Sequence, residues 1–152
     1  EERGVAEAIA RNLRDMSKLK VPVVVSIVGE GGSGGALGLA IGDSILMQEF
    51  AIYSVIPPEG CAAILWRDAN QKVEAAKALK ISAPELLELG VVDTIIDEPC
   101  GGAHADQVQA GVLVDKALSA TLDQLDRDSV ETRLAKRYEK FRRMGNVGLS
   151  NS

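Results

Sequence analysis

Hydrophobic residues in this chain follow helical spacing in some segments and form short unbroken runs in others. Over residues 3–19 they recur at every third or fourth position, which predicts an amphipathic helix. The largely β-branched run at 21–28 predicts a strand that is buried on both faces. No charged residue occurs at 34–42, which predicts a short helix packed on every side.

The same patterns predict the elements of the rest of the chain. Ser82 and Glu85 form a capping box at the start of one helix, and Gly90 follows its end. Ser129 caps the last helix, and the tail from Gly145 is expected to be loose. In chain order we expect strands at 44–49 and 51–56, helices at 60–69, 71–80 and 82–90, a strand at 91–96, a loop at 101–106, and helices at 107–125 and 129–144. This alternation of helices and strands predicts an α/β fold.

Composition narrows the classes of function. With 152 residues, the chain is about the size of one domain. Its net charge of −5 and its aromatic content of only 3% disfavour nucleic acid as a partner. Cys61 and Cys100 form neither a CxxC pair nor a cluster with histidine, so we predict no metal site in this chain, and two free thiols suit the cytoplasm. No apolar run reaches the ~18 residues that span a membrane, so no membrane partner is expected.

A glycine cluster separates the first expected strand from the helix that follows it. Five of the seven residues at 29–35 are glycine, although glycine is a poor helix former by about 1 kcal/mol per residue. Glycines at a strand-to-helix turn allow unusual dihedral angles, close backbone approach, or amides that face a ligand. They also allow a helix simply to pack closely on its neighbours. We therefore place the candidate site at this turn.

Two nucleotide-binding motifs share features with the turn. Gly29, Gly31 and Gly34 match the dinucleotide fingerprint, and Glu49 ends the next expected strand, where a ribose-binding acid belongs. The intervening helix is short for a β-α-β crossover, however, and two adjacent strands follow it. A P-loop is excluded because no Lys-Ser or Lys-Thr follows the glycines.

A serine-hydrolase motif overlaps the same glycines. Residues 31–35 follow the Gly-x-Ser-x-Gly pattern of a nucleophile elbow. Asp93, Asp97 and His104 follow Ser33 in the order of an α/β-hydrolase triad, and His104 is the only histidine of the chain. A serine between glycines is also well explained as a turn or helix-cap residue.

A third interpretation uses backbone amides instead of side chains. The first N–H groups of a helix lack intrahelical acceptors and lie at the positive end of its dipole. At the glycine turn they would form an oxyanion hole, which stabilises an enolate or ureido anion without donating a proton. We expect the N–H groups of Gly34 and Gly35 to form this hole because they begin the helix.

Several segments carry a more specific resemblance. Residues 27–36, 53–66 and 98–104 together resemble the carboxyltransferase α subunits of bacterial acetyl-CoA carboxylases. Residues 1–13 and 136–145 are similar to the same family. The family chain is longer, and this sequence begins without Met and without a signal peptide. We therefore expect it to be the C-terminal half of a longer chain.

The resemblance implies a fold and disfavours one chemistry. The family has the crotonase-like fold, a superhelix of ββα units, of which this chain would form a partial domain with C-terminal helices. Residues 1–126 would be the C-terminal half of the carboxyltransferase domain, and residues 127–152 its basic helix and tail. Hydratases of that fold carry a glutamate at the position of Leu37, which cannot transfer a proton, so hydratase chemistry is disfavoured.

The resemblance also implies a reaction and its partners. The chain would help to transfer a carboxyl group from carboxybiotin, on its carrier protein, to acetyl-CoA, which gives malonyl-CoA in the first committed step of fatty acid biosynthesis. Biotin is then the cofactor, and ATP is used by the carboxylase subunit of the complex. Gly34 and Gly35 would hold the biotin oxygen, and Gly31 and Gly32 would shape the turn of the substrate site. Gly60 would line the wall of that site or would simply be a turn residue before a helix. The expected protein partners are the β subunit, in an α2β2 assembly, and the biotin carboxyl carrier protein.

Two other features allow more than one interpretation. Ile64, Leu65 and Trp66 are expected to be core or subunit contacts. The helix at 129–144 carries six Lys or Arg residues, which suits a solvated face, while docking of an acidic partner or a CoA phosphate is the alternative. A truncated homologue that serves as a non-catalytic interaction module is the competing hypothesis for the whole chain.

Overall fold

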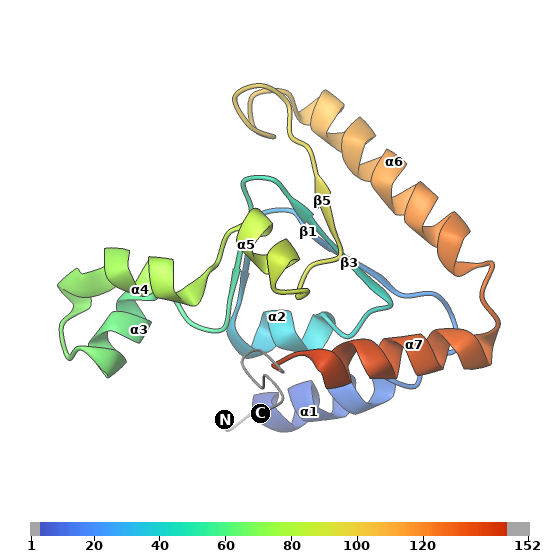
Figure 1. Ribbon diagram of the computed structural model, residues 1–152, viewed down its shortest axis with the longest axis horizontal. Helices are drawn as coiled ribbons and strands as arrows, with labels where there is room; N and C mark the ends of the chain where they lie inside the picture. Colours follow the sequence, from blue (N-terminus) through green and yellow to red (C-terminus); the bar gives the residue numbers. More distant parts are fainter. Residues whose placement is uncertain (1–3, 146–152) are drawn as a thin grey trace, which may run out of the picture.

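The computed structural model of the chain describes residues 4–145, as seven α-helices, one 3-10 turn and five short strands (Figure 1). The predicted loose tail lies outside these residues, apart from Gly145 itself. In chain order the elements are α1 (Val5–Met16), β1 (Val24–Ile27), β2 (Glu30–Gly32), α2 (Ser33–Leu39), β3 (Ser44–Gln48), β4 (Ile52–Ser54), α3 (Pro58–Leu65), η1 (Ala69–Gln71), α4 (Lys72–Leu79), α5 (Ala83–Glu88), β5 (Thr94–Ile96), α6 (Gln107–Leu125) and α7 (Val130–Arg143).

The strands form two small parallel sheets. One sheet has the order β1-β3-β5, and the other pairs β2 with β4. The register places Val25 opposite Ile45, and Met47 opposite Ile95. Each of the first two strands of the larger sheet is followed by a strand of the smaller sheet and then by a helix, which is the ββα order expected of a crotonase-like fold.

The core lies around the central strand β3. Ile45, Leu46 and Met47 are almost completely buried, and Leu86 of α5 joins the main hydrophobic cluster. Strand β1 was predicted to be buried on both faces, but its residues from Val24 to Ser26 are only half-buried. The reason is its position at one end of the three-stranded sheet, where it pairs with β3 alone.

Helix α2 differs from its prediction in position and in burial. It begins at Ser33 and ends at Leu39, so the last glycines of the cluster belong to the helix. Leu37 and Leu39 are 53% and 63% exposed, and Gly38 is the buried residue of this helix. The prediction of a helix packed on every side is therefore wrong, because a segment without charges is not buried unless other elements cover it.

Capping residues and other local sequence patterns predicted the bounds of other helices to within a few residues. Helix α6 has the predicted bounds, and the Asp106 side chain caps its start. The capping box of α5 is formed, and hydrogen bonds from the Ser82 hydroxyl and backbone lower the pKa of Glu85. Helix α3 starts at Pro58, before the predicted start, because proline fits the first turn of a helix.

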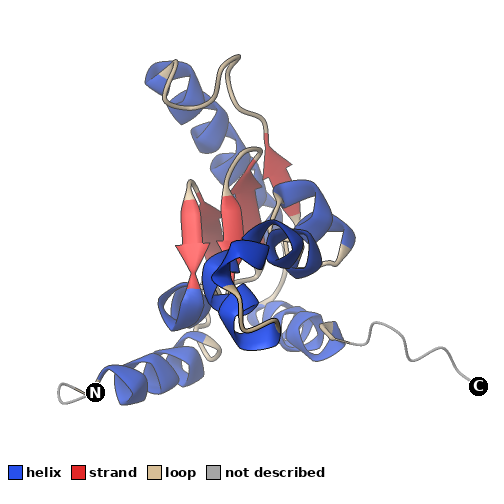
Figure 2. Ribbon diagram, turned by 90° about the vertical axis from the view of Figure 1, so that its left-hand side faces the viewer, coloured by secondary structure: helices blue, strands red, loops and turns tan. Residues whose placement is uncertain are grey.

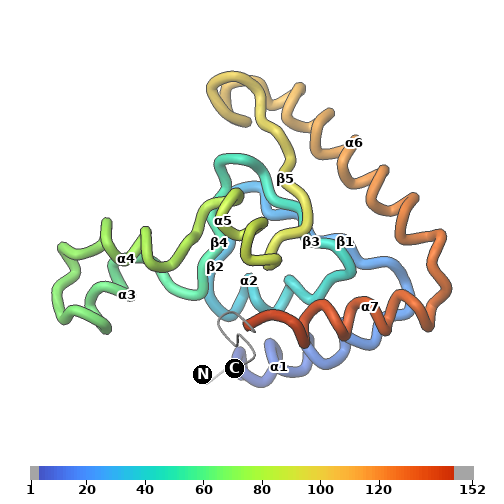
Figure 3. Tube along the Cα trace, viewed as in Figure 1, coloured from blue at the N-terminus to red at the C-terminus, as the bar shows by residue number. Residues whose placement is uncertain are grey.

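The elements spread outward from the two sheets. The arm, which we define as residues 58–79, projects away from the strands, and α6 leaves the sheet on another side (Figures 1 and 3). Helices α1, α2 and α7 lie at one end of the strands (Figure 1), and the helices nearest the N and C marks in Figure 2 lie at the same end. Within residues 4–145, no helix combines the length and the apolar character needed to cross a membrane.

Candidate functional site

The glycine turn joins strand β2 directly to helix α2. Gly32 at the N-cap is extended, with φ −144° and ψ 149°, and its residue type offers no side chain to cap the helix. Ser33 follows with φ 57°, in the left-handed region that non-glycine residues rarely adopt. The first N–H groups of α2 therefore have neither an intrahelical acceptor nor an N-cap side chain.

The glycines of the turn differ in how closely other atoms pack around them. A Cβ added at Gly31 would lie 2.7 Å from the Tyr53 ring, so close packing of β2 on β4 requires glycine there. A Cβ at Gly34 would lie 3.4 Å from Ile9 of α1. At Gly35 an added Cβ would meet no atom within 4 Å, so packing does not explain this glycine.

Two cavities flank the turn. The first, of about 470 Å³, is lined by Ser33 and Gly34 together with side chains such as Leu37, Tyr53 and Phe141. None of the described residues that line it is charged. Burial raises the pKa of the Tyr53 phenol, which therefore stays neutral at physiological pH. The second cavity, of about 440 Å³, includes residues 25–32, so Gly31 and Gly32 line the opposite side of the turn.

The predicted hydrolase triad does not come together. Ser33 does lie at a strand-to-helix turn, but Oδ2 of Asp93 accepts a hydrogen bond from the Ile45 N–H at 2.7 Å and pairs with Lys140. His104 and Asp97 are exposed, and the loop that carries His104 lies at the opposite end of the molecule from α2 (Figures 1 and 2). The described residues thus provide Ser33 with no triad.

Gly60 lies apart from the other predicted site residues. It belongs to α3 in the arm, and an added Cβ would lie 3.0 Å from the Ile56 side chain. Close packing of α3 on Ile56 accounts for this glycine. Gly60 lines neither of the two cavities beside the turn, and the arm that carries it projects away from α2 (Figure 1).

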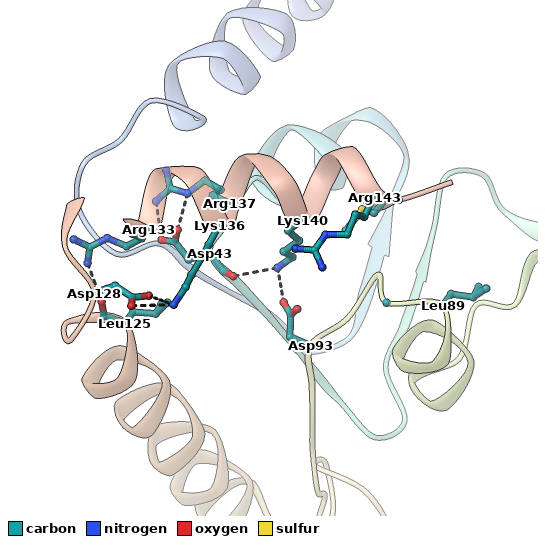
Figure 4. A pocket seen from close by; sticks show the side chains of 12 residues that line it. Asp43, Leu89, Asp93, Leu125, Asp128, Arg133, Lys136, Arg137, Lys140 and Arg143 are labelled. Carbon is teal, nitrogen blue, oxygen red and sulfur yellow. Dashed lines mark hydrogen bonds and ion pairs between the residues drawn. The ribbon is translucent and has the colours of Figure 1, made fainter. Parts of the chain in front are cut away.

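The basic helix contains the polar contacts that the sequence patterns missed. Arg133 and Arg137 of α7 are buried, so the prediction of a simply solvated face is wrong. Arg137 forms an ion pair with Asp43, and Lys140 pairs with Asp93 (Figure 4). The sequence did contain a sign of the ion pair at Asp43. This aspartate is the only charged residue between Glu30 and Glu49, and a buried charge requires a partner.

Metal chemistry finds no support in these side chains. Across the described part of the chain, no group of three or more His, Cys, Asp or Glu residues is placed to hold a metal ion. Cys61 is buried and Cys100 is exposed, and both are free. The chemistry available at the turn is therefore that of backbone N–H groups beside an uncharged cavity.

Sequence comparison identifies relatives over nearly the whole chain. The family model described as "Acetyl co-enzyme A carboxylase carboxyltransferase-like" matches residues 1–145. A protein of Geobacter metallireducens is 56% identical over 144 residues, which cover 95% of this chain and 45% of that protein. A protein of Bacillus cereus is 53% identical over 152 residues, which cover 100% of this chain and 47% of that protein. Both are named acetyl-coenzyme A carboxylase carboxyl transferase subunit alpha, and this chain spans somewhat less than half of their length.

Solved structures share the fold at low sequence identity. A Pseudomonas malonate decarboxylase hetero-tetramer in complex with coenzyme A matches with a TM-score of 0.65 and 18% identity, over 93% of this chain and 58% of that chain. Transcarboxylase 12S matches with a TM-score of 0.57 and 22% identity, over 64% of this chain and 22% of that chain. An enoyl-CoA hydratase of Mycobacterium avium subsp. paratuberculosis matches with a TM-score of 0.53 and 21% identity, over 88% of this chain and 55% of that chain. These likenesses confirm the predicted α/β, crotonase-like fold.

Proposed function

Because this chain belongs to the acetyl co-enzyme A carboxylase carboxyltransferase-like family, we propose that it forms part of a carboxyltransferase site at the glycine turn. The reaction would transfer a carboxyl group to acetyl-CoA and give malonyl-CoA. When bound, the carboxylated biotin of a carrier protein supplies that carboxyl group. In this site the N–H groups of Gly34 and Gly35 hold an oxygen atom on which negative charge develops.

The observation that carries this proposal is the start of α2. Its first N–H groups have no intrahelical acceptor and no N-cap side chain, and Gly34 lines a cavity without charged side chains. With its uncharged and largely apolar lining, this cavity strengthens the attraction between an N–H dipole and an oxyanion relative to bulk water. Its 470 Å³ and its uncharged lining also suit the neutral ring of biotin, which would lie against Leu37 and Tyr53.

The names of the relatives support the proposal of a partner subunit. These proteins are called subunit alpha, so we propose a β subunit as the partner, in an α2β2 assembly in the cytoplasm, together with a biotin carboxyl carrier protein. The exposed side chains of Ile64 and Leu65 on the arm would suit contacts with another subunit. We retain the proposed division at residue 126, with α7 as a basic C-terminal helix that packs on the domain.

A pair of substitutions at one position tests the amide directly. In the α subunit that contains this sequence, Gly35→Pro removes one N–H, while Gly35→Ala keeps the N–H and adds a methyl group to open space. Assembly with the β subunit is confirmed by gel filtration, and decarboxylation of malonyl-CoA with free biotin is then measured. Loss of one oxyanion-hole donor typically lowers kcat by about 10²–10³. We expect this loss for Gly35→Pro and an effect of no more than a few-fold for Gly35→Ala.

Ser33→Ala separates the amide proposal from the nucleophile alternative. The substitution removes only the hydroxyl group, so the amide site predicts an active enzyme. An assembled Gly35→Pro enzyme with normal kcat would contradict the use of this amide. An inactive Ser33→Ala enzyme would instead make Ser33 the reacting group.

A further inference from the structure

Arg137 of α7 is more completely hydrogen-bonded than an ordinary surface arginine. Its side chain is 2% exposed, and all five of its N–H groups donate to the protein. Nε and Nη2 donate to the two carboxylate oxygens of Asp43, at 2.8 and 2.6 Å. The other three N–H groups donate to the carbonyl oxygens of Met16, Leu19 and Val21, at 3.1, 2.9 and 3.1 Å.

We propose that Arg137 is a positioning residue for the amides at the start of α2, an inference that rests on the proposed function of those amides. Arg137 touches neither the turn nor the cavity. It acts through the segments that it joins, which are the end of α1, the strand entry at residues 19–23 and the turn between α2 and β3, and through α7, which carries it. Each of these segments bears on the position of α2.

The first connection runs through the turn that follows α2. The helix ends at Leu39, and Asp43 lies just before β3. Asp43 accepts hydrogen bonds from Arg137 and, at 2.8 Å, from the Val23 N–H. The ion pair therefore ties the C-terminal end of α2 to the chain that leads into β1.

The second connection runs through α1, which lies directly behind α2. The Asn12 side chain donates to the carbonyl oxygen of Gly38. Ile9 packs against both Gly34 and Gly38, because a Cβ added at these glycines would lie 3.4 and 3.3 Å from its side chain. Because Arg137 binds the carbonyl oxygen of Met16 at the end of α1, and that of Leu19 just beyond it, it limits sliding of the surface that supports Gly34.

The third connection is α7 itself. Phe141 lies one turn after Arg137, packs against the main core, and lines the 470 Å³ cavity with Met144. Lys140 holds the same helix to Asp93 and to the Asp43 carbonyl oxygen (Figure 4). Arg137 thus links α1, which packs against the helix that carries the amides, to α7, which contributes Phe141 to the wall of the cavity.

The planar guanidinium is required for this role. Its five donors form a rigid fork that can bind a carboxylate with two N–H groups and still reach three carbonyl oxygens. A lysine at the same position has the charge but only three donors on one nitrogen atom. Arg137→Lys therefore keeps the buried charge pair and removes most of the positioning contacts.

The test compares Arg137→Lys with Lys136→Met in the assembled α and β subunits. Lys136 is the neighbouring residue, its side chain is 65% exposed, and it pairs with Asp128 at the surface. Steady-state decarboxylation of malonyl-CoA gives kcat and KM for both enzymes, and amide hydrogen exchange reports on Val23 and on α2. We expect Arg137→Lys to lower kcat at least tenfold with KM changed less than twofold, and to speed exchange at Val23 and Ala40. Lys136→Met should match the unmodified enzyme.

Each outcome decides the inference. An assembled Arg137→Lys enzyme with kcat within twofold of the unmodified enzyme overturns it. If Arg137→Lys does not assemble, Asp43→Asn is judged by the same kcat criterion, and failure of both to assemble shows a role in folding only, which also overturns it. Failure of the proposed function is separate, because it appears as full activity of the assembled Gly35→Pro enzyme.

Discussion

Helix α7 buries two of its charged side chains, whereas the arm exposes several of its apolar side chains. Helix α7 is rich in Lys and Arg, yet Arg133 and Arg137 are buried beneath it. The arm is rich in apolar residues, yet Ile64, Leu65 and Trp66 are 70%, 65% and 45% exposed. Side-chain polarity alone would have suggested the reverse arrangement.

The difference shows that burial depends on the partners that distant segments provide. Arg137 is buried because Asp43 and three carbonyl oxygens, all more than 90 residues away in the chain, accept its N–H groups. The arm packs mainly on itself, through small residues such as Ala62 and Ala75, and its larger side chains face outward. Its exposed apolar surface is consistent with the proposed contact to another subunit.

Removal of the Arg137 guanidinium should have the largest effect. Arg137→Met leaves Asp43 buried without its cation, and breaking a buried pair costs about 3–5 kcal/mol. Urea unfolding of the purified protein measures this change in the free energy of unfolding. The matched variant Lys136→Met removes an exposed charge and should cost at most about 1 kcal/mol. Equal losses in the two variants would show that the burial of Arg137 does not matter.

Overpacking the interior of the arm should have an intermediate effect. Ala62 is completely buried where α3 meets α4, so Ala62→Leu should reduce the free energy of unfolding by about 1–3 kcal/mol. Ala63 is exposed on the same helix, and Ala63→Leu should change stability by less than about 0.5 kcal/mol. Protease cleavage within residues 58–79 should accelerate for Ala62→Leu alone. If both variants behave alike, the small core of the arm is not tightly packed.

Truncation of an exposed apolar residue of the arm should have the smallest effect. Leu65→Ala should change the free energy of unfolding by less than about 0.5 kcal/mol, because the side chain is 65% exposed. The same substitution at Leu86, which is 6% exposed, should cost about 2–5 kcal/mol. Thermal or urea unfolding of both variants makes the comparison. A loss above about 1 kcal/mol at Leu65 would mean that this surface is already covered in the isolated protein.

Local sequence signals were sufficient for most element positions and for the location of the turn. The bounds of α6, the capping box of Ser82 and Glu85, and the cap at Ser129 depend on residues only a few positions apart. The glycine cluster identified the turn for the same reason, and the motifs spread along the chain indicated the family that the comparisons confirm. These features required no knowledge of how distant segments meet.

Only the tertiary structure decided which residues are buried and which act together. It exposed the uncharged helix α2, separated Gly60 from Gly34 and Gly35, kept His104 away from Ser33, and placed Arg137 on Asp43. The physical reason is that burial and ion pairing depend on segments brought together by folding, whereas capping and helix periodicity depend on neighbours in the chain. The sequence by itself therefore determined the elements and the chemistry offered by the turn, and the fold determined which side chains support that turn.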